Sequence, residues 1–193
     1  MAYLRRKGAR TIYLDGAPRA VSLYQRAGLV KVCRSLRLVG ELNGAPDPQV
    51  RPMQSQDLPE VKELDGRAFG ADRGFFLERR LAMYPELCKV MEKEGEMQGF
   101  ILGRRGNGLV SAGPWIARQG VEHPEALLLS LAREARGDPV AIGVLEANQG
   151  VVELIRSLGL EERPNPPWRM ALGDKSELGM SPMALAVGSA AKG

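Results

Sequence analysis

A stretch near the start of this chain returns in a similar form near its end. Thr11–Leu29 (TIYLDGAPRAVSLYQRAGL) corresponds to Ile142–Leu160 (IGVLEANQGVVELIRSLGL). Each copy has a short apolar run, an acidic residue, a turn and an amphipathic run that ends in Gly-Leu. The register holds without gaps, because three equivalent pairs are each 131 positions apart: Ala17 and Asn148, Tyr24 and Ile155, and Gly28 and Gly159. The pattern predicts a strand, a turn and a helix used twice. Chance similarity between two short amphipathic units is the alternative.

A second extended segment follows each copy and closes on glycine. These segments are RSLRLVG at Arg34–Gly40, within an expected strand or bent pair of strands at Val30–Val39, and WRMALG at Trp168–Gly173. The chain begins at Ala2–Lys7 with what resembles the last turn of a helix, so we expect its domain to start before this sequence. The repeated unit is therefore strand, helix, strand, with the first copy lacking earlier elements.

Composition places the chain among soluble globular proteins, with 44% hydrophobic and 26% charged residues. No apolar run approaches the roughly 20 residues of a membrane span, and no signal peptide is recognisable. Cys33 and Cys88 both lie in apolar runs and are expected to be reduced core residues, which favours a cytoplasmic location. One histidine and scattered carboxylates predict no metal site.

The excess of basic charge belongs to the first segment alone. Residues 1–50 carry nine Lys/Arg against three Asp/Glu, whereas the remainder carries eighteen against twenty. Aromatic residues make up only 5% of the chain, which leaves little surface for stacking on nucleic-acid bases. Nucleic acid and membrane are therefore not expected as partners.

Stretches rich in proline, glycine and small residues divide the chain into four regions. We expect a partial unit at 1–40, a Pro- and Gly-rich linker at 41–49, a second unit at 50–173 and a small-residue tail at 174–193. The second unit reads as β-α-α-β-β-β-α-β-α-β, with a short strand or helix at Pro182–Val187 in the tail. This order predicts an α/β fold (mixed α+β) with a mixed, mostly antiparallel sheet and helices on both faces.

This order of elements, together with the pattern A-x-x-L-Y-x-x-x-G-L at Ala20–Leu29, resembles the GNAT superfamily of acetyl-CoA-dependent N-acetyltransferases. The first segment resembles the C-terminal half of a GNAT domain, and residues 50–173 resemble a whole second one. Together they resemble a tandem-GNAT acetyltransferase that lacks the N-terminal half of its first domain. The resemblance implies acetyl-CoA as co-substrate and a small-molecule or peptide amine as acceptor.

The resemblance also implies where the co-substrate would bind. In the family a strand splays from its neighbour, and its free backbone groups pair with the pantetheine arm. Trp115 and Ile116 lie in the corresponding stretch, and Pro114 cannot donate to a ladder, although an edge-strand proline without a ligand is the alternative. The pyrophosphate loop corresponds to Gln119–Pro124, with both glycine positions lost to Glu122 and Pro124. Arg118 and Gly120 are then the remaining candidates for binding the pyrophosphate.

A tyrosine of the last helix can protonate the departing thiolate in this family, and an asparagine near the start of that helix often contacts the cofactor. The first copy keeps the tyrosine as Tyr24, whereas the second has Ile155 there. Conversely, the second copy keeps the asparagine as Asn148, whereas the first has Ala17. Tyr24 is thus the candidate catalytic residue and Asn148 a candidate cofactor-binding residue, with a half-buried aromatic as the alternative for Tyr24.

The acceptor amine also needs a base, for which few residues are candidates. Glu92, Glu94 and Glu96 flank a predicted hairpin, where solvated charge is the simpler interpretation. His123 beside Pro124 is expected to be a surface residue at a helix start.

The functional prediction is an N-acetyltransferase that moves an acetyl group from acetyl-CoA to a primary amine by direct attack. Its machinery would lie mainly in the first unit, so that the chain is either inactive alone or completes a site by pairing with a second copy, as a homodimer, or with another fragment. The alternative is a catalytically degenerate GNAT-like module for binding or dimerisation.

Overall fold

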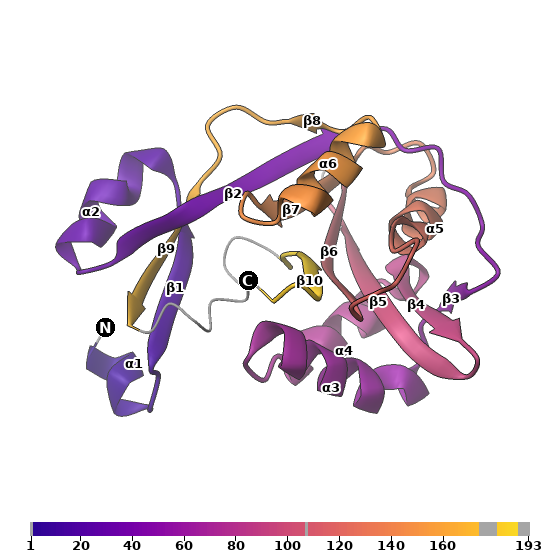
Figure 1. Cartoon of the computed structure of the whole chain (residues 1–193), viewed down its shortest axis with the longest axis horizontal. Coiled ribbons are helices and arrows are strands. Elements are labelled where there is room, and N and C mark those ends of the chain that lie inside the picture. The colour runs from indigo at the N-terminus through magenta and orange to yellow at the C-terminus, as the bar shows by residue number, and fades with distance from the viewer. Residues whose placement is uncertain (1, 107, 174–180, 189–193) are drawn as a thin grey trace.

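Within the described residues, ten strands form one open, twisted sheet with helices on both of its faces, as the sequence predicts (Figure 1). The computed structural model describes residues 2–106, 108–173 and 181–188. Along the sheet the order is β1-β9-β2-β7-β6-β5-β4-β3, with β8 beside β2 and β10 beside β6. Every pairing is antiparallel except β6 with β7, which is parallel.

The first segment contributes two helices and two strands, of which β2 runs from one end of the molecule toward α6 and β7 (Figure 1). They are helix α1 (Ala2–Arg6), strand β1 (Thr11–Gly16), helix α2 (Val21–Arg26) and strand β2 (Val30–Gly40). Gly28 ends α2 with a positive φ of 88°, and the N–H of Leu29 donates to the carbonyl of Tyr24 (3.0 Å). This backbone conformation favours glycine, which explains the Gly-Leu ending of the repeated unit.

The second unit begins with a short strand, two helices and an antiparallel meander. These are β3 (Val50–Pro52), α3 (Leu58–Phe69), α4 (Gly74–Met83), β4 (Cys88–Lys93), β5 (Glu96–Arg105) and β6 (Val110–Ala117). It continues with α5 (Glu125–Ala135), β7 (Val140–Leu145), α6 (Gln149–Ser157), β8 (Glu161–Glu162) and β9 (Trp168–Gly173). Apart from β8, the helices and strands follow the order that the sequence predicts for this unit.

The predicted linker, and the part of the predicted tail that the structure describes, both pack against the fold. Residues 41–47 have no regular structure, but a Cβ on Gly44 would come within 2.5 Å of the α5 backbone at Arg133. Of the predicted tail, residues 174–180 and 189–193 lie outside the described residues. The part at Pro182–Val187 contains strand β10 (Ala184–Ala186).

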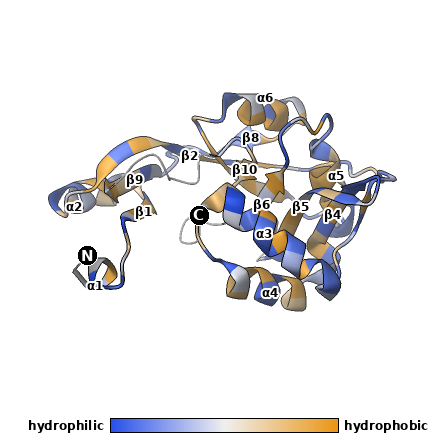
Figure 2. Ribbon diagram, turned by 60° about the horizontal axis from the view of Figure 1, so that its bottom comes forward, coloured by the Kyte–Doolittle hydropathy of each residue, from blue (hydrophilic) through white to orange (hydrophobic). Residues whose placement is uncertain are grey.

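Alternating side chains of the sheet fill two cores, one on each face. Ile101 of β5 belongs to the core under α5 and α6, whereas Phe100 and Leu102 belong to the core under α3 and α4. A third, smaller core around Leu29 and Met170 lies beneath α2. Figure 2 shows α3 and α4 banded in hydrophilic and hydrophobic residues, as expected of helices with one buried face.

The two copies of the repeated unit exchange their last strands. The second half of β2 pairs with β7 over Ser35–Gly40, although β7 belongs to the second copy. Strand β9 of the second copy pairs in turn with β1 over Thr11–Gly16, and also with the first half of β2. Residues 1–40 and 50–173 therefore contribute strands to each other, and their separation into two domains stays a prediction.

Candidate functional site

Strands β6 and β7 pair at their beginnings and then separate. Their parallel ladder covers only Val110–Ala112 of β6 and Val140–Ile142 of β7. Beyond this point we call the separation the β6–β7 fork, formed by residues 113–117 and residues 143–145. It begins at the Gly113-Pro114 pair, where proline has no N–H to donate. The fork lies where the sequence places a splayed strand, and its backbone groups are available to a segment other than β6 or β7.

A segment of the chain's own tail, residues 181–188, occupies the fork. Ala184 and Ala186 of β10 pair antiparallel with Ile116 and Trp115 of β6. The N–H of Ala117 donates to the carbonyl of Met183 (3.0 Å). On the opposite side, the N–H of Val187 donates to the carbonyl of Gly143 on β7 (2.9 Å). The tail thus binds both arms of the fork through its backbone.

Three of the predicted cofactor-binding residues meet at this point. The side chains of Trp115 and Ile116 are buried in opposite cores, and both residues pair with β10 through their backbone. The side-chain amide of Asn148, just before α6, donates to the carbonyl of Ala184 (3.4 Å). The indole Nε1 of Trp115 is buried and has no hydrogen-bond partner among the described residues. These three residues lie together around the tail.

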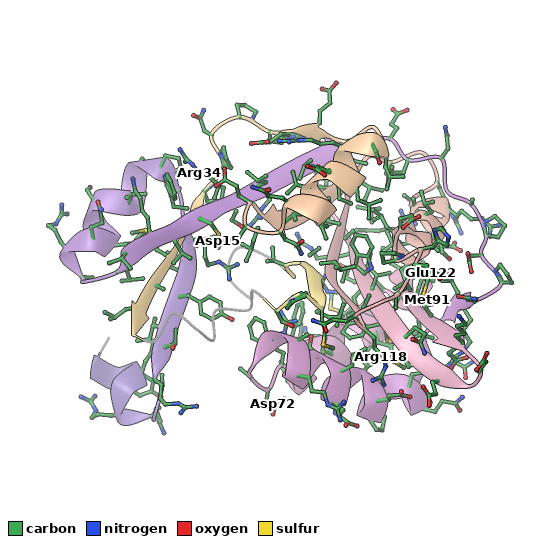
Figure 3. All side chains as sticks on the ribbon, viewed as in Figure 1. Asp15, Arg34, Asp72, Met91, Arg118 and Glu122 are labelled. Atoms are coloured by element: carbon green, nitrogen blue, oxygen red, sulfur yellow. The ribbon has the colours of Figure 1, made fainter. Side chains whose placement is uncertain are left out.

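The other two predicted residues lie along the loop between β6 and α5. Nε of Arg118 donates to the carbonyl of Met97 (2.6 Å), and its Nη2 lies 3.6 Å from Glu60 (Figure 3). Gly120 adopts a positive φ of 86° and lines a cavity of about 220 Å³ that also includes Glu122. Arg118 is therefore engaged by the protein itself.

Two acidic side chains lie at the N-terminus of α5, and Lys93 lines the same cavity as Glu122. Glu122 lies in the loop before the helix and Glu125 is in its first turn. His123 is exposed, with its Nδ1 3.3 Å from Oε1 of Glu125, as expected for a surface residue at a helix start. Carboxylates already complement the helix dipole at this end, and they oppose the approach of a pyrophosphate.

Tyr24, the predicted general acid, lies apart from the fork. It is half-buried on α2, in the small core with Leu14 and Trp168, and a Cβ on Gly16 would come within 2.9 Å of its ring. Figures 1 and 2 both place α2 at the far end of the molecule from β6 and β10. At the equivalent position of α6, Ile155 is fully buried in the main core.

The predicted hairpin carboxylates do not meet at the fork. Glu92 accepts hydrogen bonds from Arg51, and these bonds hold the pKa of its carboxyl below the usual range. Glu94 and Glu96 are exposed at the β4–β5 turn. A lowered pKa makes Glu92 a weaker base, so the structure favours solvated and paired charge at this hairpin.

One buried ionic cluster could not be identified from the sequence. The Asp15 carboxylate, fully buried on β1, accepts hydrogen bonds from Nε of Arg169 (2.6 Å), Nη2 of Arg37 (2.9 Å) and Oγ of Ser35 (2.6 Å). Its partners lie on β9 and β2, far away in sequence. The one available signal was the repeat, because Asp15 occupies the same position as Glu146, which accepts a hydrogen bond from the N–H of Arg34 (3.1 Å).

A cavity of about 580 Å³ lies between β1 and the loop that joins α3 to α4. Its lining includes Tyr13, Phe69, Asp72, Arg73, Phe76 and Arg169. The Tyr13 and Phe69 rings meet edge to face, with centroids 6.0 Å apart. Burial raises the pKa of the Tyr13 hydroxyl above its ordinary value. The cavity combines aromatic surface with a carboxylate, Asp72, labelled in Figure 3.

Both cysteines are free and buried, as expected. Burial raises the pKa of Cys88 to about 12, so its thiol is protonated at neutral pH. No group of three or more His, Cys, Asp or Glu suited to a metal ion occurs within the described part of the chain. No helix in the described ranges is long and apolar enough to cross a bilayer.

A sequence profile of the acetyltransferase (GNAT) domain matches residues 61–181, which include both arms of the β6–β7 fork. This match covers most of the chain. The chain belongs to the GNAT acetyltransferase family. No curated protein matches it.

Solved structures of GNAT proteins share the fold. A candidate acetyltransferase of Pyrococcus horikoshii is 25% identical, with a TM-score of 0.79 over 100% of this chain and 63% of that one. A GCN5-related N-acetyltransferase of Sphaerobacter thermophilus is 20% identical, with a TM-score of 0.61 over 84% and 59%. Arabidopsis thaliana Naa50, in complex with the bisubstrate analogue CoA-Ac-MVNAL, is 12% identical, with a TM-score of 0.51 over 65% and 97%. This GNAT chain thus spans about three fifths of the length of the first two proteins.

Proposed function

We propose that this chain is an N-acetyltransferase of the GNAT type that moves an acetyl group from acetyl-CoA to a primary amine. The observation that carries the proposal is the β6–β7 fork, which holds an extended segment through backbone hydrogen bonds from both arms. The pantetheine arm of acetyl-CoA carries amides and can pair with such a strand as a peptide does. Membership of the GNAT family supports the same reaction class.

The residues of the fork fit the pantetheine arm better than the pyrophosphate. Gly113 and Gly143 leave room for an inserted backbone, because a Cβ on either would come within 2.7 Å of Val187. The Asn148 amide and the unpartnered indole N–H of Trp115 are further polar groups at or beside the fork. At α5, by contrast, Glu122 and Glu125 oppose the phosphates. Affinity would therefore come mainly from the arm.

Transfer would proceed by direct attack of the neutral amine. Its nitrogen lone pair forms a bond to the thioester carbonyl carbon, and collapse of the tetrahedral intermediate breaks the carbon–sulfur bond. The amine proton passes to a base, and the departing CoA thiolate takes up a proton. Tyr24 lies away from the fork, so as a general acid it would act on acetyl-CoA bound at a separate site on the first unit, and not on acetyl-CoA held in the fork.

We further propose the cavity beside β1 as the site of the acceptor. The Arg169 and Arg73 guanidinium groups already lie over the Tyr13 and Phe69 rings. The Asp72 carboxylate is therefore the group of this lining that complements an ammonium. A small-molecule or peptide amine suits this lining. We also expect a cytoplasmic location, in keeping with two free, buried cysteines.

A homodimer could complete the site of the first unit. Strand β1 lies at the end of the sheet, and within the described residues it pairs only with β9. An open strand edge of this kind can accept a strand from a second copy. Light scattering of the purified chain tests this proposal, and a monomeric mass at micromolar concentration would exclude it.

A catalytically degenerate binding or dimerisation module is the second candidate function. Three observations favour it: the tail occupies the fork, Ile155 stands where an acid would act, and Glu122 stands where the pyrophosphate would bind. Measuring both acetyl-CoA binding and turnover separates the two functions. Binding without turnover, or no binding at all, fits the module and not the enzyme.

The test measures acetyl-CoA binding and thiol release with a panel of primary amines. A ligand at a hundredfold over its dissociation constant should raise the free energy of unfolding by about 2.7 kcal/mol. If Tyr24 is the general acid, Tyr24→Phe should lower kcat by roughly 100-fold while leaving the dissociation constant of acetyl-CoA unchanged. Equal kcat values for the two proteins would remove Tyr24 from the mechanism.

A further inference from the structure

The tail segment 181–188 is built into the β6–β7 fork as a strand with two buried sides. Leu185 and Ala186 are 8% and 4% exposed and belong to the core under α5 and α6. Met183 and Ala184 pack against the opposite core, under α3 and α4. The segment therefore fills the gap between two layers of helices, with a register irregularity between Ala184 and Ala186.

The segment uses the hydrogen-bonding groups that an inserted ligand would need. Its carbonyl groups accept hydrogen bonds from the N–H of Ala117 on β6 and from the side-chain amide of Asn148, and its Val187 N–H donates to the carbonyl of Gly143 on β7. Each of these hydrogen bonds would have to break before another extended molecule could pair with both arms. The contacts are also tight, because a Cβ on Gly113 would lie 2.3 Å from the carbonyl oxygen of Val187.

We propose that residues 181–188 are a tethered occupant of the fork that excludes acetyl-CoA, so that acetyl-CoA binds only after the tail leaves. This inference rests on the proposed function, which assigns the fork to the pantetheine arm. The tail and the arm have the same chemistry, an extended chain with amide donors and carbonyl acceptors, and the fork has room for one of them. The tail thereby regulates access of acetyl-CoA to the second unit.

The occupant lowers the apparent affinity without altering the fork itself. When the binding-competent form is a fraction of the population, the apparent dissociation constant rises by the inverse of that fraction. A variant that weakens tail docking should therefore bind acetyl-CoA more tightly, although every residue of the fork is unchanged.

Leu185→Asp is the variant that tests the proposal, because a carboxylate is strongly disfavoured in the core that Leu185 occupies. Pro182→Asp is the matched control, since it places the same charge in the same segment at an exposed position. If the tail is docked in about 90% or more of wild-type molecules, calorimetric titration of the full-length proteins should give a dissociation constant of acetyl-CoA at least about tenfold lower for Leu185→Asp than for the wild type. Pro182→Asp should match the wild type.

Hydrogen exchange on the wild-type chain provides a measurement that needs no variant. Saturating acetyl-CoA should increase exchange in peptides covering residues 181–188, while peptides covering Trp115–Ala117 stay protected. Without ligand, Leu185→Asp should show the same increase in the tail, and Pro182→Asp should not.

The outcomes separate this inference from the proposed function. If acetyl-CoA binds wild type and Leu185→Asp equally and the tail stays protected, the tail does not compete, whereas the acetyl-CoA assignment stands. If exchange shows a released tail in Leu185→Asp and neither protein binds acetyl-CoA, both the fork assignment and this inference are overturned. Tighter binding by Leu185→Asp, together with ligand-induced tail release in the wild type, supports both.

Discussion

At the scale of single residues, Asp15 is a buried charge held by several partners. Its carboxylate is fully buried, and it accepts hydrogen bonds from three side chains on two other strands. The Arg169 guanidinium, itself 2% exposed on its side chain, lies over the Tyr13 ring at 4.9 Å. A buried charge of this kind is tolerable only while its partner is present. The cluster therefore ties β1, β2 and β9 together where the copies exchange strands.

Asp15→Ala should lower the free energy of unfolding by about 3–5 kcal/mol, because it leaves the Arg169 charge buried and uncompensated. Glu146→Ala is the control at the equivalent position of the second copy, where the glutamate is exposed and the loss should stay below about 1 kcal/mol. Urea denaturation of both variants measures the difference. Similar losses at the two positions would contradict the role assigned to burial.

At the scale of elements, Arg51 joins three pieces of secondary structure. From β3 it donates two hydrogen bonds to Asp57, which precedes α3, both at 2.8 Å, and it also pairs with Glu92 on β4. Asp57 in turn accepts from the N–H of Gln54 (2.7 Å), completing a capping box at the start of the helical region. Chiefly through the Arg51 hydrogen bonds, the pKa of Asp57 lies below its ordinary value.

Arg51→Met should make stability less dependent on pH in the acid range. A carboxyl whose pKa is lowered in the folded state adds stability above its unfolded pKa, near pH 4, and loses it as the pH falls through the folded value. The variant should lose about 1–3 kcal/mol at pH 7, and the deficit should shrink below about pH 4 as Asp57 is protonated. Glu92 adds little, because it is partly exposed.

Arg67→Met is the control for this experiment, since Arg67 pairs with Glu63 on the exposed face of α3. It should change the free energy of unfolding by less than about 0.5 kcal/mol at every pH. Denaturation at several pH values compares the two variants, and a deficit for Arg51→Met that stays constant from pH 7 to pH 3 would refute the linkage.

At the scale of the whole molecule, β2 joins the two copies of the repeated unit into one sheet. It pairs with β9 at its start and with β7 at its end, so it borders both the small core and the main core. Its pairing with β9 has a register irregularity between Lys31 and Cys33, and its pairing with β7 begins at Ser35. Leu38 near the end of β2 is fully buried in the main core.

Both ends of the molecule should therefore unfold in one transition. The chain contains two tryptophans, and these report the two regions separately: Trp115 in the main core and Trp168 beside the small one. Single-tryptophan variants, Trp168→Phe and Trp115→Phe, should each show a single transition in both fluorescence and circular dichroism, with midpoints that coincide between the two probes.

Leu38→Ala should lower the free energy of unfolding by about 2–5 kcal/mol and shift both tryptophan signals together. If the variant shifts the unfolding midpoint reported by Trp115 but not the midpoint reported by Trp168, the two ends unfold independently and residues 1–40 form a separate domain.

Much of this architecture follows from local sequence. Periodic apolar residues predict α5, turn residues separate the three strands β4 to β6, and glycine ends the repeated helices, because these features depend on neighbours a few residues apart. Residue order also indicates the GNAT family and the position of the β6–β7 fork. The contacts across long separations could not be read in this way. Asp15 and Arg169 meet only through the pairing of β1 with β9, and Val187 reaches Gly143 only because the tail folds back. Such contacts depend on which strand edges remain open after the local elements have formed, and that is a property of the assembled sheet.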